Sequence, residues 1–288
     1  LPLGDRTNLL VGGRWSDAYF EDTEAGNQRL TGTLGIERRM SERSTLSLNA
    51  TAERVEFDDE AVSSDYDRQS GYLEYAMQGA RTNLSLRAGG TALHDYGDTT
   101  SGPLLNLTIE RQVSARSTLT LNAGTELTDS ADAMRREQQI GGIELDGSNP
   151  IVSTDQFQSD FVSLAWALEG ARTTLDLAVD LRSEDYERDA TFNRDAIGAT
   201  ASLVRRLSAR LSWRLYGGWS KQDFDRSDVD FDEWNAGTGF DWLLTETVGV
   251  TLTGERFEGS GDTAFGAGLR DYTENRVTVR LTYTPRRR

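Results

Sequence analysis

The sequence predicts an all-β fold built from long antiparallel strands, and three observations support this. Apolar and polar residues alternate with a period of two over segments of about 9 to 12 residues. Short polar turns that resemble one another recur along the chain, from residues 40–44 to residues 244–247. Longer segments rich in Asp, Gly and Ser join the strands at their other ends. Together these features indicate strand pairs linked alternately by short and long connections.

About fourteen segments carry the alternation. The segment 44–57 shows it clearly, because Leu46 and Leu48 share one face while Ser47 and Asn49 share the other. The predicted strands, in chain order, are 8–19, 28–40, 44–57, 69–78, 82–94, 102–113, 117–128, 157–169, 172–184, 195–207, 210–223, 231–244, 247–258 and 275–285. Each strand therefore has one apolar face and one polar face.

The connections fall into two classes. Short turns lie at 40–44, 78–82, 113–117, 169–173, 207–210 and 244–247, and longer loops at about 21–27, 58–68, 95–101, 129–156, 185–194, 224–230 and 259–274. An even number of strands, with short turns on one rim and long loops on the other, is typical of barrels in the bacterial outer membrane. We therefore predict one domain, residues 1–288, folded as a transmembrane antiparallel up-and-down β-barrel with short periplasmic turns and long extracellular loops.

Composition excludes several other classes. The mean hydropathy is -0.56, and no apolar run approaches the roughly 18 residues of a membrane-spanning helix. The formal net charge of -16 opposes binding to nucleic acid phosphates. The chain has no cysteine, so it has neither disulfides nor thiolate metal sites. We expect no cofactor and no nucleic acid partner.

A soluble sandwich or propeller is the alternative fold. Its strands are usually about 5 or 6 residues long, and small residues such as Ala50, Ala52 and Ala88 on the apolar face would leave voids in a packed core. Lipid tails fill such hollows. Aromatic residues on or beside the apolar face, several near strand ends, also fit a membrane interface: Trp15, Tyr75, Trp166, Trp213, Trp219, Trp234, Phe240, Trp242 and Tyr283.

If the polar face points inward, charges of both signs line the lumen. The candidate lumen-lining residues are Glu53, Arg87, Glu126, Asp180, Arg182, Arg214, Glu255, Arg276 and Arg280. A ring of about 14 strands is wider than the 8-strand barrels that side chains fill, so a water-filled channel is sterically feasible. The same charges could instead pair and stiffen the wall. Arg87, Arg182, Arg214 and Arg280 could form an anion-attracting ladder, which favours a polar solute, either saccharide-like or anionic.

Catalytic residues are sparse. The single histidine, His94, has the parity of the outer face near a rim, and no serine is placed beside it as a nucleophile. One histidine cannot form a metal cluster, and no phosphate-binding glycine loop or zinc motif occurs. We expect that the protein is not an enzyme and has no metal site.

The C-terminal segment "RDYTENRVTVRLTYTPRRR" resembles the closing strand of outer-membrane barrels of the beta-barrel porin 2 type. These are similar to barrels associated with exopolysaccharide gene clusters. The matching residues are Tyr272, Glu274, Asn275, Arg276, Val277, Val279, Leu281 and Tyr283. The resemblance implies an outer-membrane pore or an export partner without catalytic residues. One departure is that Tyr283 is followed by Thr284, Pro285 and three arginines, whereas such strands usually finish on an aromatic residue.

Two functions remain open from the sequence. The first is a channel, porin-like or associated with polysaccharide export, which passes a polar or charged solute. The alternative is a non-conducting structural or adhesion barrel whose acidic outer loops bind a surface polymer, a partner protein or divalent cations. The expected partners are outer-membrane lipid and, for an assembly, further copies of the chain or an export complex.

Overall fold

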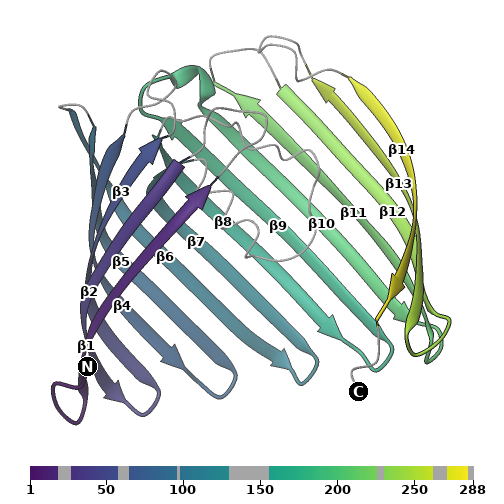
Figure 1. The fold of residues 1–288 in the computed structure, drawn as a ribbon, viewed down its shortest axis with the longest axis horizontal. Coiled ribbons are helices and arrows are strands. Elements are labelled where there is room, and N and C mark those ends of the chain that lie inside the picture. Colours follow the sequence, from purple (N-terminus) through teal and green to yellow (C-terminus); the bar gives the residue numbers. More distant parts are fainter. Residues whose placement is uncertain are drawn as a thin grey trace.

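All fourteen predicted strands are present in the computed structural model (Figure 1), which describes residues 1–18, 27–57, 65–95, 98–129, 156–225, 230–261 and 271–284. They are β1 (Thr7–Ala18), β2 (Asn27–Ser41), β3 (Ser44–Phe57), β4 (Tyr66–Gln78), β5 (Thr82–Asp95), β6 (Asp98–Ser114), β7 (Ser117–Asp129), β8 (Gln156–Glu169), β9 (Thr173–Tyr186), β10 (Arg194–Arg206), β11 (Leu211–Phe224), β12 (Asp230–Leu243), β13 (Val248–Gly261) and β14 (Tyr272–Tyr283). They form one antiparallel sheet in chain order, which confirms the up-and-down prediction.

The long connections differ from the prediction in two described places. The predicted loop 95–101 is wrong, because β5 and β6 stay paired up to Asp95 opposite Asp98. Thr99 and Thr100, both β-branched, favour the extended strand there. The predicted loop 185–194 contains a short 3-10 helix, Ala190–Phe192, whose first turn is capped by Asp189. Most of the loops 21–27, 58–68, 129–156, 224–230 and 259–274 lies outside the described residues. No helix of the described part of the chain is both long and apolar enough to cross a membrane.

The recurring turn motif has a local cause. In the turn between β2 and β3, Ser41 Oγ accepts a hydrogen bond from the backbone N of Arg43 at 3.2 Å. Ser114 and Ser208 accept the same bond, also at 3.2 Å, from the residue two positions later. A serine hydroxyl that bonds the backbone two residues on mimics a backbone turn, so it reverses the chain in little space.

The two faces of the sheet have inverted exposure. On β3, Leu48 is 62% exposed, while Ser47 and Asn49 on either side of it are 8% and 6% exposed. The same inversion holds at Leu34, Val162 and many other apolar residues of the chain. In water a sheet buries its leucines and exposes its polar residues. Apolar side chains that point out of the sheet on most strands match the lipid-facing band of a membrane barrel.

Aromatic residues mark both limits of this apolar band. Trp15, Trp219 and Trp234 lie toward the long-loop ends of β1, β11 and β12, and all three are more than a third exposed. Trp242 and Tyr283 lie at the short-turn ends of β12 and β14 and are also exposed. Eight positions separate Trp234 from Trp242 on one strand, roughly 26 Å along it, which is comparable with the band of about 25 Å in such barrels. The predicted interfacial aromatics on these strands therefore form two rows.

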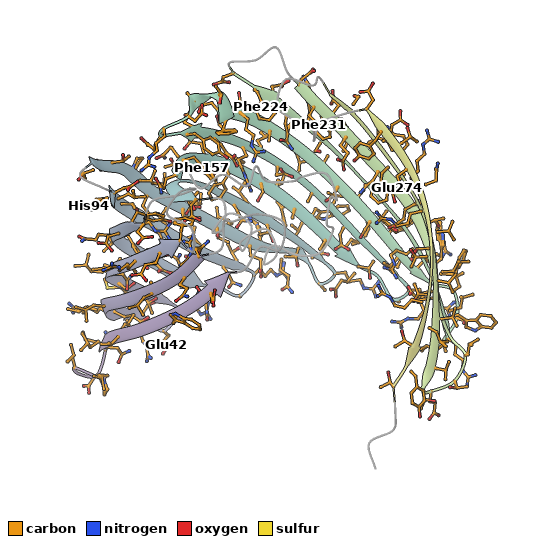
Figure 2. The ribbon with its side chains drawn as sticks, turned by 45° about the horizontal axis from the view of Figure 1, so that its top comes forward. Glu42, His94, Phe157, Phe224, Phe231 and Glu274 are labelled. Atoms are coloured by element: carbon orange, nitrogen blue, oxygen red, sulfur yellow. The ribbon has the colours of Figure 1, made fainter. Side chains whose placement is uncertain are left out.

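The sheet has two free edges, β1 and β14, which end the curled sheet in Figure 2. The described residues show no pairing between them. The two edges nevertheless match in the direction of their backbone hydrogen-bonding groups and of their side chains. Leu9 N donates to Leu1 O at 2.6 Å and Thr284 N donates to Thr247 O at 2.9 Å, so the odd-numbered residues of both strands direct their backbone groups to the free edge. Those residues, such as Val11 and Val279, also carry the outward side chains.

Candidate functional site

The polar face is the concave face of the sheet. Arg29 on β2 and Asp129 on β7 belong to strands that are not neighbours, yet Arg29 Nη2 lies 2.6 Å from Asp129 Oδ1 and Nη1 lies 2.9 Å from Oδ2. Side chains of strands that far apart in a curved sheet can meet only across its concave side. The face shared with Arg29 therefore points inward, and the leucine-rich face points outward.

Arg29 is the centre of a buried ionic network. Its Nη1 also donates to Glu53 Oε1 at 3.0 Å, and its Nε donates to Asn27 Oδ1 at 2.9 Å. Arg68 on β4 donates to the other oxygen of Glu53 at 2.6 Å. The side chains of Arg29 and Glu53 are only 2% and 11% exposed. We call this the Arg29 network; its members are Asn27, Arg29, Glu53, Tyr66, Arg68 and Asp129.

An apolar cluster adjoins the network. Val55, Tyr66, Leu93 and Leu127 pack together from β3, β4, β5 and β7, with Phe57 beside them. The hydroxyl of Tyr66 donates to Asp129, so Tyr66 belongs to both groups. Ionic and apolar contacts thus tie β2–β5 to β7 near their long-loop ends. This arrangement narrows the concave side of the sheet at that rim.

A second cluster occupies the same level of the sheet farther along the chain. The rings of Phe157 and Tyr186 lie 4.8 Å apart, and Phe192 of the short 3-10 helix lies 5.7 Å from Tyr186. Arg194 Nε donates to Glu184 Oε2 at 2.8 Å, directly below these rings in the register of β9 and β10. Phe157 and Glu184 are almost completely buried.

These apolar residues were missed by sequence reasoning. All the buried apolar side chains of the described chain lie near long-loop strand ends; we call them the collar: Val55, Tyr66, Leu93, Leu127, Phe157, Tyr186, Phe224, Phe231 and Phe257. The signal was present on β3, where Ser47, Asn49, Thr51 and Glu53 alternate on the inner face and Val55 then takes the next inner position. On β3, a change from polar to apolar at constant parity marks the collar.

The predicted arginine ladder is largely paired with acids. Arg87 Nε lies 3.2 Å from Glu74, and Arg214 Nη2 lies 2.6 Å from Asp241. Arg182 lies 3.7 Å from Glu184. Arg280 stands opposite Thr251 of β13 and has no ion pair among the described residues. Pairing lowers the attraction of these arginines for a passing anion.

The other predicted lumen residues are also on the concave face or beside it. Glu126 accepts a hydrogen bond from Asn106 Nδ2 at 3.5 Å, and Asp180 stands opposite Gly198 of β10. Arg276 Nε lies 3.0 Å from Glu274, and its guanidinium carbon lies 5.0 Å from the ring centre of Phe257. The predicted set is therefore spread around the sheet instead of gathered at one point.

Glu255 shows how side chains reach across a strand. It accepts a hydrogen bond from the Tyr216 hydroxyl, although β12 lies between their strands. The register places Gly237 of β12 between them, and a Cβ on Gly237 would come within 2.5 Å of Tyr216 Cζ. Glycine at this position therefore lets the tyrosine lie flat over β12.

His94 is on the outer face of β5, as predicted, and is exposed. It stands opposite Asp67 of β4 and Thr99 of β6. Among the described residues, no group of three or more His, Cys, Asp or Glu side chains is arranged to hold a metal ion.

Comparison with known proteins gives remote similarities. No protein-family model matches the chain, and no curated protein matches it. Among solved structures, the outer membrane channel DcaP of Acinetobacter baumannii is 11% identical over 96% of this chain and 97% of its own, with a TM-score of 0.46. An anion-selective porin from Comamonas acidovorans is 10% identical over 96% and 99%, with a TM-score of 0.40. A loop-deletion mutant of OmpT, an outer membrane protein of Vibrio cholerae, is 9% identical over 97% and 99%, with a TM-score of 0.45.

These identities and scores are too low to transfer any property to this chain. The assignment rests on the chain itself: one antiparallel sheet in chain order, short turns on one rim, and an outward apolar band between two aromatic rows. This is the architecture of a bacterial outer-membrane β-barrel.

Proposed function

We propose that the protein is an outer-membrane channel that passes a polar or charged solute along its charged concave face. The observation that carries the proposal is the inversion of the two faces. Leu48 is 62% exposed on the outside, while the partly exposed charge pairs Arg87–Glu74 and Arg214–Asp241 are inside. A barrel whose only role is to sit in lipid gains nothing from charges on its inner wall, because buried charges cost desolvation energy.

The pairing of charges supports a small polar solute over a strongly anionic one. Arg87, Arg182 and Arg214 each have a carboxylate within 4 Å. Paired charges offer donors and acceptors side by side, which suits hydroxyl-bearing or zwitterionic solutes. A saccharide-like solute meets this description. The C-terminal resemblance to barrels associated with exopolysaccharide clusters supports the same choice.

The experiment is single-channel recording after reconstitution in planar bilayers. A channel gives stable current steps. The amplitude of these steps should fall when a neutral saccharide that enters the lumen is added. The informative variants are Arg87→Gln and Arg214→Gln, which leave Glu74 and Asp241 without their cations and should increase the preference for cations over anions. The matched control is Arg256→Gln, an arginine–glutamate pair on the outward parity of β13. Equal shifts in all three variants would contradict an inner wall that controls selectivity.

One observation favours the alternative, a barrel that does not conduct. Inner-face residues near the long-loop rim, such as Glu184, Arg194 and Phe231, are buried. A closed wall at that level would give no stable current steps in the same recordings. In that outcome the acidic outer loops become the candidate binding surface for a surface polymer, a partner protein or divalent cations.

A further inference from the structure

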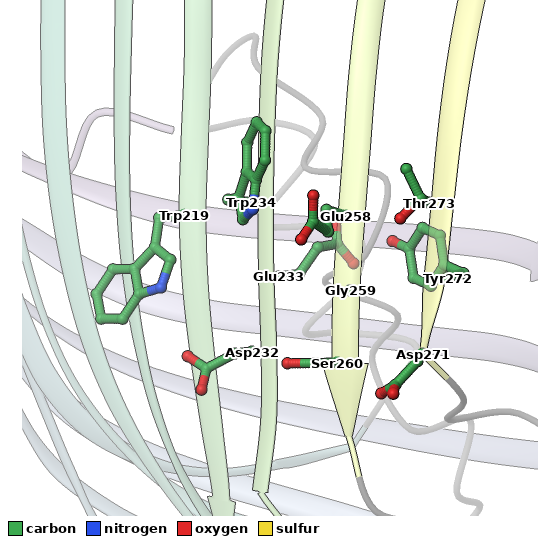
Figure 3. Close-up of a pocket in the computed structure, with 10 residues that line it drawn as sticks. All are labelled: Trp219, Asp232, Glu233, Trp234, Glu258, Gly259, Ser260, Asp271, Tyr272 and Thr273. Carbon is green, nitrogen blue, oxygen red and sulfur yellow. The ribbon is translucent and has the colours of Figure 1, made fainter.

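A hollow of about 380 Å³ lies at the long-loop ends of β11–β14 (Figure 3). It is separate from the Arg29 network, which lies on β2–β7. Most of its side chains have the outward parity of their strands, because Trp234 pairs in register with Trp219 and with Glu258. The residues that line it are Trp219, Asp232, Glu233, Trp234, Glu258, Gly259, Ser260, Asp271, Tyr272 and Thr273.

Two aromatic side chains on the outward face, Trp219 and Trp234, form the apolar part of the hollow. They are 39% and 37% exposed, whereas Tyr272 has the inward parity of β14 and its ring lies over Gly259 on the inner face. Exposed rings offer a negative quadrupole face to a cation. The structure already uses one of them in this way, because the guanidinium carbon of Arg256 lies 5.8 Å from the ring centre of Trp234.

The charge of the hollow is negative. Asp232, Glu258 and Asp271 contribute three carboxylates, while Glu233 has the inward parity of β12 and is only 2% exposed. No lysine, arginine or histidine is among the described residues that line the hollow. The nearest cation is Arg256, which lies over Trp234 and whose Nη2 is 2.9 Å from Glu258 Oε2. Lys221 pairs with Asp223 and Asp230, which do not line the hollow. One arginine and three carboxylates leave a net negative charge. A free anion would therefore be repelled, whereas a cation with an apolar body matches both the rings and the carboxylates.

The position of the hollow indicates where its ligand comes from. On β14 the outward residues change from Val279 and Val277 to Asn275 and Thr273 toward the long-loop rim. On β13 they change in the same direction from Leu252 to Glu258 and Ser260. The hollow thus begins where the apolar band ends, at the level of lipid headgroups and in contact with water.

We propose that this hollow binds an organic ammonium ion, with the aromatic rings against its alkyl groups and the carboxylates beside its positive charge. Two sources carry this chemistry: a soluble amine, or the ammonium headgroup of a lipid. The inference does not depend on transport through the lumen, because the hollow lies on the outward side of the sheet.

The first test compares choline with 3,3-dimethylbutanol, a neutral molecule of the same shape, by isothermal titration calorimetry of the whole protein in a zwitterion-free detergent. We expect choline to bind at least tenfold more tightly. Equal binding of the two molecules would overturn the proposal, because shape alone would then account for binding. Displacement of choline by millimolar calcium would also overturn it and would assign the carboxylates to a divalent cation.

The second test uses variants. Trp234→Leu and Glu258→Gln should each weaken choline binding by roughly three- to fivefold, the range of an exposed cation–π contact or ion pair. The matched controls are Trp213→Leu at the other end of β11 and Glu274→Gln on the inward parity of β14, and both should bind choline as the parent does. Folding of each variant is checked by its mobility on an unheated detergent gel. An equal loss in the controls would contradict the assignment to this hollow.

A third measurement separates the two sources. In vesicles of anionic phosphatidylglycerol alone, soluble choline should still bind, whereas vesicles with added phosphatidylcholine should abolish that binding if the headgroup takes the site. Continued binding in both vesicles identifies a soluble amine as the ligand. No binding in either vesicle, with binding retained in detergent, would overturn the site in its membrane setting.

Discussion

The two halves of the sheet use charge differently. Between β2 and β7, Arg29 reaches Asp129 from five strands away, and both side chains are at most 4% exposed. Between β11 and β14, Arg214 pairs with Asp241 on the adjacent strand, and these side chains are 38% and 39% exposed. Both contacts measure 2.6 Å. The same contact distance therefore joins strands five apart at Arg29 and adjacent strands at Arg214.

The difference teaches that the surroundings of an ion pair, more than its length, decide its structural role. Water screens the Arg214 pair, so its partners lose little when they separate. The Arg29 network is desolvated, so removal of one member leaves an uncompensated charge. We expect the Arg29 network to act as a brace, which means that it holds β2–β7 together and that its loss strongly destabilises the fold. We expect β11–β14, whose ion pair is exposed, to deform more easily. The following predictions test that contrast.

The largest effect is expected for Arg29→Ala. The substitution leaves Asp129 and Glu53 buried without their shared cation and should lower the free energy of unfolding by about 3–5 kcal/mol. Urea unfolding in detergent or lipid vesicles measures this loss. Because the link from β2 to β7 is also removed, current through a reconstituted channel should become larger or noisier. A loss of unfolding free energy no larger than that of an exposed ion pair would contradict this role of the Arg29 network.

A similar or slightly smaller loss is expected for Phe157→Ala. This side chain is 1% exposed and stacks on Tyr186, so its truncation leaves a cavity within the collar. The expected cost is about 3–4 kcal/mol in the same unfolding measurement. Phe240→Ala, at a lipid-facing position that is 42% exposed, is the matched control and should cost clearly less. Equal losses would show that the collar is not a packed core.

A disulfide between the two free edges should link β1 to β14 and close the sheet. Unpaired backbone groups of β1 and β14 are costly in lipid, and their odd-numbered residues share pleat and hydrogen-bond direction. We therefore expect Val279→Cys to cross-link with a cysteine at Val11 or Gly13 within one chain, with a gain of about 2–4 kcal/mol. Leu10→Cys, on the opposite face, is the control that should not cross-link. Disulfides formed only between two chains would mean that the edges pair between copies.

The smallest effect is expected for Arg214→Ala. Its pair with Asp241 is exposed, so the loss of unfolding free energy should be about 0–1 kcal/mol and should shrink further in high salt. The same unfolding assay at two salt concentrations measures it. A loss as large as that of Arg29→Ala would remove the contrast between the two halves.

Much of the fold was predictable from local patterns. The segment 44–57 matches β3 residue for residue, because alternation with period two is a property of the strand itself. The turns were predictable because a serine and the backbone two residues later make the contact. The loop at 95–101 was predicted wrongly, since Gly, Asp and Thr residues that suggest a loop can also extend a hairpin once the strands are in register.

The candidate site was predictable only in part. Parity placed Glu53 and Arg87 on the polar face, but it did not show that Glu53 sits between Arg29 and Arg68 or that Arg87 is neutralised by Glu74. On β3, the collar was visible as a change of polarity at constant parity. Its packing was not, because a period along one strand contains no information about a strand five positions away.

By itself, the sequence determined the strands, their two faces, the short-turn rim and the apolar band, since each depends on neighbours within a few residues. Only the tertiary structure decided which inner side chains meet. Arg29 and Asp129 are 100 residues apart, and their contact depends on the curvature of the sheet and on the summed register of five strand pairs. Those quantities are set by the whole sheet, so the brace, the collar and the aromatic hollow became visible only in three dimensions.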